Sequence, residues 1–180
     1  MTRRFLPLAA ALCALAIANP ASAQLAKGAK APTFATQGAE AGKAFAFNLT
    51  SALAKGPVVL YFYPKAFTKG CTVEAHAFAE AMDDFHKAGA TVIGMSADDL
   101  DTLKKFSTEA CRDKFPVAIA SSQVINAYDV ASEMDGKATG RTDRTTYVIG
   151  QDGRIAMAFS DRAPEEHITR SLAAVKALKH

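Results

Sequence analysis

The stretch YFYPKAFTKGCTVEAHAF, which runs from Tyr61 to Phe78, passes from a strand pattern through a proline and a glycine into a helix pattern. Its first residues end the run VVLYFY, Val58 to Tyr63, which is continuously apolar, β-branched or aromatic. Such a run is typical of a central strand that is covered on both faces. From Cys71 the apolar residues recur at helical spacing. We therefore expect a cysteine at the start of a helix that follows a buried strand.

The rest of the chain alternates between strand and helix patterns. We expect strands at 43–49, 90–97 and 116–120, helices at 71–88, 99–111 and 123–128, a strand hairpin at 144–159, and a last helix at 164–178. Residues 24–42 lack a period and predict an extended entry, and residues 132–142 predict a polar loop. This order predicts an α/β fold with a mixed central β-sheet flanked by helices, an order that the thioredoxin-like fold accommodates.

The first 23 residues have the order of a secretory leader. Arg3 and Arg4 precede an apolar run, Phe5 to Ala18, and the small residues Ala21-Ser22-Ala23 come just before Gln24. The apolar run is shorter than the ~20 residues that span a bilayer. We expect residues 1–23 to be a signal peptide that is removed, and residues 24–180 to be one thioredoxin-like domain exported to the bacterial periplasm, without a membrane anchor.

Composition limits the partners of the mature chain. Removal of residues 1–23 lowers Lys plus Arg from 21 to 19 against 18 acidic residues, so the net charge falls from +3 to +1. A nearly neutral chain has no electrostatic drive towards nucleic acid. Of the three cysteines, Cys71 and Cys111 remain. One pair of thiols in an exported protein is either a structural disulfide or a redox couple.

The position of Cys71 favours its reactive form. The thiolate is the nucleophilic form of cysteine, and the amino terminus of a helix favours negative charge. Gly70 lets backbone donors come close to the sulfur. Pro64 fixes the exit from the strand, and Thr68 brings a hydroxyl within reach of the sulfur or of an incoming oxygen. Each residue also has an ordinary use, because proline ends strands, threonine caps helices and cysteine fills cores.

Taken together, Pro64, Thr68 and Cys71 form the string P-x-x-x-T-x-x-C directly after a buried strand. This string resembles the peroxidatic motif of the peroxiredoxins. The pattern FYPKxxTxGCTxEA around it resembles the Q-type, or bacterioferritin-comigratory protein-like, branch of the AhpC/TSA family. The resemblance implies a thioredoxin-like fold and a thiol-dependent peroxidase that uses neither a metal nor an organic cofactor.

The resemblance also implies roles for single residues. Cys71 would attack hydrogen peroxide or an alkyl hydroperoxide and become a sulfenic acid, with Pro64 and Thr68 as its neighbours. Arg144 opens RTTYVIG, which is similar to a family strand, and would be the arginine that favours the thiolate and binds peroxide oxygens. Glu74 matches a family carboxylate that orients arginines. From the residues alone, Arg144 is also compatible with a surface charge, and Glu74 with a favourable first-turn helix residue.

The chain departs from the commonest Q-type pattern in one respect. Many members carry a resolving cysteine five residues after the first, where this chain has His76. Some relatives carry it in the region of the third helix, so Cys111 is the candidate resolving cysteine. A disulfide requires Cα atoms within ~7 Å, whereas the start of one helix and the end of another can lie farther apart. We therefore expect one or both helices to unwind locally on oxidation. The alternative is that Cys111 is an inert packed thiol and that an external thiol resets Cys71.

The expected partners are a hydroperoxide substrate and a thioredoxin-like or other thiol reductant, with the protein as a monomer or a weak homodimer. Two other functions stay open. One is an exported thiol–disulfide oxidoreductase, which shares the fold but carries a C-x-x-C motif that this chain lacks. The other is a redox-sensing or binding domain with a structural Cys71–Cys111 disulfide. His76, His86 and His167 form no metal-ligand pattern with each other or with the cysteines.

Overall fold

The computed structural model describes residues 24–178, so the expected signal peptide lies outside the described residues. The elements in chain order are β1 (Ala35–Glu40), β2 (Lys43–Asn48), α1 (Leu49–Leu53), β3 (Val58–Phe62), α2 (Lys69–Lys87), β4 (Thr91–Ser96), α3 (Leu100–Glu109), β5 (Val117–Ile119), α4 (Ser122–Ala127), β6 (Ala131–Met134), β7 (Lys137–Thr142), β8 (Thr145–Ile149), β9 (Ile155–Ser160) and α5 (Glu165–Ala177). Within the described part, none of the helices is both long and apolar enough to cross a bilayer.

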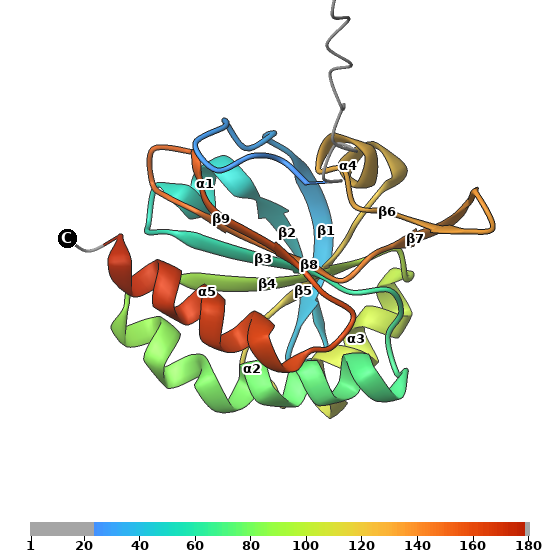
Figure 1. Cartoon of the computed structure of the whole chain (residues 1–180). Coiled ribbons are helices and arrows are strands. Elements are labelled where there is room, and N and C mark those ends of the chain that lie inside the picture. The colour runs from blue at the N-terminus through green and yellow to red at the C-terminus, as the bar shows by residue number, and fades with distance from the viewer. Residues whose placement is uncertain (1–23, 179–180) are drawn as a thin grey trace, which may run out of the picture.

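Seven strands form one sheet in the order β2-β1-β5-β4-β3-β8-β9. The strands β3, β4 and β5 are parallel, and the outer strands are antiparallel to their neighbours. The helices α2, α3 and α5 cover one face of the sheet, while α1 and α4 lie on the other (Figure 1). The predicted mixed sheet flanked by helices is therefore confirmed.

The strand β3 lies inside this sheet and explains the continuous apolar run. All five of its residues are buried, with Val59 and Tyr61 in the core under α2, and the alternate residues Val58, Leu60 and Phe62 in the core under α1. A strand with a helix layer on each side has no solvent face, so no polar alternation is required. β3 pairs with β4 on one side and with β8 on the other.

The sequence patterns did not predict three of the strands, β1, β6 and β7. β1 lies in the expected extended entry and pairs with β2 and β5. Its Gly38 is required because a Cβ there would lie 2.5 Å from the Val117 carbonyl oxygen, and a small-residue strand shows little hydrophobic alternation. The expected polar loop at 132–142 is the hairpin of β6 and β7, which turns at Asp135 and Gly136 with positive φ. Its residues are nearly all exposed, so it too lacks an apolar period.

Several expected element ends were wrong by one or two residues. The strand predicted at 43–49 ends at Asn48, whose side chain caps the short helix α1, which was not predicted, by accepting a hydrogen bond from Ser51 N. α2 begins at Lys69, so Cys71 is its third residue and not its first. α3 ends at Glu109, so Cys111 lies in the turn after the helix.

Candidate active site around Cys71

Cys71 lies in the first turn of α2, at the end of the loop that leaves β3. Thr68 precedes the helix, and the backbone bond from Thr72 N to Thr68 O, 2.9 Å long, closes the first turn. The N–H groups of a first helical turn have no acceptor within the helix, so they present partial positive charge. Cys71 is only 1% exposed, so its sulfur is shielded from water and interacts with this partial charge more strongly than an exposed sulfur would.

Arg144 brings a full positive charge to the same sulfur. It directly precedes β8, and the pairing of β8 with β3 places it next to the loop that carries Cys71. Its Nη2 donates to Cys71 Sγ at 3.5 Å, its Nη1 donates to Glu74 Oε2, and its Nε donates to the Arg162 carbonyl at 3.0 Å. Three separate acceptors therefore fix the plane of one buried guanidinium.

Gly70 leaves room for that guanidinium. A Cβ at this position would lie 3.2 Å from Arg144 Nη2, which is closer than most real Cβ contacts. The sequence suggested that Gly70 admits backbone donors to the sulfur. In the structure its missing side chain also admits Arg144 to the start of α2.

Glu74, one turn after Cys71, is completely buried and forms an ion pair with Arg144. Burial raises the pKa of the Glu74 carboxyl, and the charge and hydrogen bond of Arg144 oppose part of that rise. Its second oxygen, Oε1, has no hydrogen-bond partner among the described residues. Glu74 therefore holds Arg144 through one oxygen, in a site where the loss of either partner would leave a buried charge uncompensated.

Pro64 and Thr68 shape the loop between β3 and α2. Pro64 is half-buried and comes two residues after β3. Thr68 is exposed, and its hydroxyl donates to the Lys65 carbonyl at 3.0 Å. The hydrogen bond found for the Thr68 hydroxyl is thus within the loop rather than to the Cys71 sulfur. Because its proton is engaged, the oxygen of Thr68 is left to accept a hydrogen bond.

Asp98 supports the same loop and was not predicted. Its Oδ2 accepts from Ala66 N at 2.7 Å and from the Ser96 hydroxyl at 2.8 Å. The carboxyl end of β4 lies beside that of β3, because the two strands are parallel neighbours. Two polar residues at the end of this buried strand, Ser96 as its last residue and Asp98 two residues later, are the signal that could have indicated this contact.

Comparisons with known proteins show the family of the chain. A profile described as the AhpC/TSA family matches residues 27–158. The chain belongs to that family. It is 36% identical over 127 residues to peroxiredoxin Q, chloroplastic, of Sedum lineare, an alignment that covers 68% of this chain and 65% of that protein. It is 34% identical over 161 residues to the protein of the same name from Suaeda salsa, covering 87% of this chain and 70% of that one.

Solved structures extend the family comparison to the fold. Peroxidoxin BcpB from Mycobacterium tuberculosis superposes with a TM-score of 0.76 at 29% identity, covering 86% of this chain and 98% of that one. Peroxiredoxin Q of Xanthomonas campestris gives a TM-score of 0.68 at 30% identity, covering 78% of this chain and 89% of that one. The resemblance to the peroxiredoxins and to their Q-type branch is confirmed. The thioredoxin-like fold of this family is confirmed with it.

The second thiol of this family member, Cys111, is also buried. Cys111 is fully buried, both thiols are free, and both belong to one buried cluster. Burial raises the pKa of the Cys111 thiol, and the nearby Asp113 charge raises it further. Tyr61 and Tyr63 belong to the same buried cluster as both cysteines. Cys111 is therefore a protonated thiol, separated from solvent, in the reduced protein.

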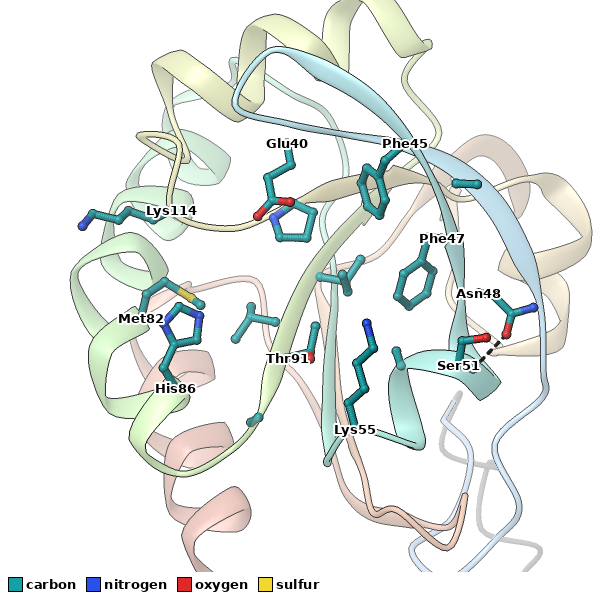
Figure 2. A pocket seen from close by; sticks show the side chains of 16 residues that line it. Glu40, Phe45, Phe47, Asn48, Ser51, Lys55, Met82, His86, Thr91 and Lys114 are labelled. Atoms are coloured by element: carbon teal, nitrogen blue, oxygen red, sulfur yellow. Dashed lines mark hydrogen bonds between the residues drawn. The ribbon is translucent and has the colours of Figure 1, made fainter.

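Several hollows of the described surface lie away from Cys71. A cavity of about 380 Å³ lies between β2, α1, the start of β4 and the end of α2, with Phe45, Phe47, Lys55, Met82 and His86 on its walls (Figure 2). Cys71 follows the carboxyl end of β3, whereas this cavity lies at the amino end of β4. A smaller hollow of about 210 Å³ is lined by Arg144, Ser160 and Arg162 among others, so it lies beside the guanidinium. We therefore assign the candidate site from the reactive side chains of Cys71 and Arg144, and not from the size of a cavity.

Proposed function

We propose that this protein is a thiol-dependent peroxidase that reduces hydrogen peroxide and alkyl hydroperoxides through Cys71. The observation that carries the proposal is the 3.5 Å contact from Arg144 Nη2 to Cys71 Sγ in a buried site at the start of α2. A cation and a helix amino terminus that meet at one sulfur favour the thiolate. The relatives named peroxiredoxin Q support the same activity.

The proposed reaction begins with attack of the Cys71 thiolate on one peroxide oxygen. A sulfur–oxygen bond forms, the O–O bond breaks, and the leaving oxygen takes a proton to become water or an alcohol. The product at Cys71 is a sulfenic acid. Arg144 stabilises the negative charge as it moves from sulfur to the leaving oxygen, and the Thr68 oxygen accepts a hydrogen bond from the peroxide. Pro64 holds the loop that positions Thr68.

Resolution through Cys111 completes the proposed cycle. The Cys111 sulfur attacks the sulfenic sulfur, water leaves, and a Cys71–Cys111 disulfide forms, which an external thiol reductant then reduces. Because Cys111 is buried and protonated, the turn after α3 has to open first. Two consecutive residues in this turn, Arg112 and Asp113, have φ of 52° and 57°, a conformation that costs free energy for residues with side chains. This strained turn is the proposed point of opening.

Thiol counting tests the resolving step. After one equivalent of peroxide, we expect the wild type to lose both free thiols and to lose the mass of two hydrogens, because a disulfide replaces two S–H groups. The variant Cys111→Ser should stop at a sulfenic acid that a sulfenate-specific probe captures. A wild type that keeps the Cys111 thiol after oxidation would rule out the bridge and would leave direct reduction of Cys71 by an external thiol.

Export is part of the proposal and rests on the leader-like order of residues 1–23. The short apolar run and the small residues before Gln24 favour export to the bacterial periplasm. The relatives named above are described as chloroplastic. A thioredoxin-like protein in the same compartment is the proposed reductant, and a mixed disulfide trapped with Cys111→Ser identifies it.

Parallel assays of peroxide consumption and of insulin reduction test the function. A peroxidase consumes hydroperoxide with a thiol reductant and leaves insulin intact. An exported thiol–disulfide oxidoreductase would do the reverse, and a domain with a structural Cys71–Cys111 disulfide would do neither. Insulin reduction without peroxide consumption would therefore refute the proposed function.

A further inference from the structure

His167 is a buried histidine that the chemistry above does not use. It is the third residue of α5, is 0% exposed, and its ring lies 4.8 Å from the Phe159 ring of β9. α5 runs alongside α2 on the same face of the sheet, and the two helices begin at the same end (Figure 1). His167 therefore lies under the end of the sheet where Arg144 meets Cys71.

Both ring nitrogens of His167 have a partner. Nε2 lies 3.0 Å from the Asp161 carbonyl oxygen and Nδ1 lies 2.8 Å from Thr146 Oγ1. A carbonyl oxygen can only accept, so Nε2 carries the hydrogen, and Nδ1 accepts from the Thr146 hydroxyl. Burial lowers the pKa of His167, the hydrogen bond and charge of Asp161 oppose part of that fall, and the charges of Arg144 and Arg170 add to it. The ring is thus a neutral imidazole in one defined tautomer.

Each of the two partners of His167 is connected to Arg144. Thr146 is two residues after Arg144 along β8. Asp161 directly precedes Arg162, whose carbonyl accepts the hydrogen bond from Arg144 Nε at 3.0 Å. The segment is also fixed by the bond from Ala163 N to Asp161 Oδ1, 2.8 Å long. His167 therefore connects β8, which directly follows Arg144, to the segment whose Arg162 carbonyl accepts the hydrogen bond from Arg144 Nε.

We propose that His167 is a positioning residue for peroxide reduction: its bonds to Thr146 and Asp161 hold the Arg162 carbonyl where it fixes the Arg144 guanidinium against Cys71. The inference rests on the proposed function, since it gives His167 a role in that reaction. Glu74 and the sulfur accept from Nη1 and Nη2, which lie on one side of the guanidinium. The carbonyl at Nε is the anchor on the other side, and without it the plane can turn away from the sulfur.

Two amide variants separate the two bonds of His167. The amide of glutamine reaches the place of Nε2 and can still donate to the Asp161 carbonyl, whereas the shorter asparagine reaches only the place of Nδ1. We expect His167→Asn to lower the rate constant of Cys71 oxidation by hydrogen peroxide about tenfold, because misplacement of a positioned group by ~1 Å can cost up to a hundredfold. His167→Gln should stay within about threefold of the wild type on the same argument.

Alkylation of Cys71 by iodoacetamide distinguishes positioning from general damage to the fold. This reagent needs the thiolate but not a guanidinium aligned with a breaking O–O bond. The ratio of the peroxide rate to the alkylation rate should therefore fall about tenfold in His167→Asn and by no more than about threefold in His167→Gln, which keeps only the bond to Asp161, with cooperative thermal unfolding in both. An unchanged ratio in a folded His167→Asn variant overturns the inference, as does an equal loss in both variants.

A second site keeps the test decisive if His167→Asn does not fold. Thr146→Val keeps the size of the side chain and removes the hydroxyl that pins Nδ1, and it should lower the same ratio by about threefold. A Thr146→Val variant with the wild-type ratio overturns the inference. A wild type that does not consume peroxide refutes the proposed function itself, whereas an active wild type with an unaffected His167→Asn variant refutes only the role of His167.

Discussion

Cys71→Ser is expected to abolish peroxide consumption. The serine hydroxyl is almost the same size as the thiol, but it is not ionised near neutral pH and is a poor nucleophile towards a peroxide oxygen. Removal of an enzyme's nucleophile lowers turnover by several orders of magnitude, so we expect a loss of more than about a thousandfold. The measurement is the initial rate of hydroperoxide loss with an excess of dithiol reductant.

Cys111→Ser is the matched control for that loss. It removes the other thiol of the described chain and leaves the Cys71 pocket intact, so its first oxidation by peroxide should keep the wild-type rate. A folded Cys71→Ser protein that still consumes peroxide faster than the dithiol alone would contradict the account, because the chemistry would then belong to Cys111 or to another group.

Arg144→Gln is expected to have the second largest effect. The variant removes the charge that lies 3.5 Å from the Cys71 sulfur, and removal of one stabilising donor from an active site costs about a hundredfold to a thousandfold in rate. It also leaves the buried Glu74 without its partner, and breaking a buried ion pair from one side costs about 3–5 kcal/mol of stability. Both the rate of Cys71 oxidation and the free energy of unfolding should therefore fall.

Two further variants separate these effects. Glu74→Gln combined with Arg144→Gln removes both charges, so stability should recover while the rate stays low. Arg144→Lys keeps the charge but not the planar fork, and one ammonium cannot reproduce the three directions of the bonds to Cys71, Glu74 and the Arg162 carbonyl. Its rate should lie between those of Arg144→Gln and the wild type. A rate that recovers together with stability in the double variant would show that Arg144 acts only on the fold.

The local part of the site could be predicted because it is contiguous in sequence. The run from Val58 to Cys71 contains the buried strand, the turn and the helix start, and each has its own composition. Arg144 was predicted only through the family resemblance, since nothing in its own neighbourhood indicates that the pairing of β8 with β3 brings it to Cys71. Contacts between distant strands depend on register, which a single pattern does not contain.

The remaining contacts could not be predicted from the sequence, for different physical reasons. The Arg162 carbonyl is a backbone group, and its role depends on the path of the chain rather than on a side chain. His167 showed only an absence of metal-ligand spacing, although its two partners make it a fixed neutral imidazole. β1 and the hairpin of β6 and β7 lack apolar alternation, because small residues or exposed positions replace it.

Chemical trapping of the oxidised sulfur tests the central claim most directly. The reduced protein is mixed with one equivalent of hydrogen peroxide and an excess of a carbon nucleophile that captures sulfenic acids, and the labelled residue is found by peptide mass mapping. The account predicts a label on Cys71, with less of it in the wild type than in Cys111→Ser, where no resolving thiol competes. A label on Cys111 with Cys71 unmodified, or unconsumed peroxide with both thiols intact, would contradict it.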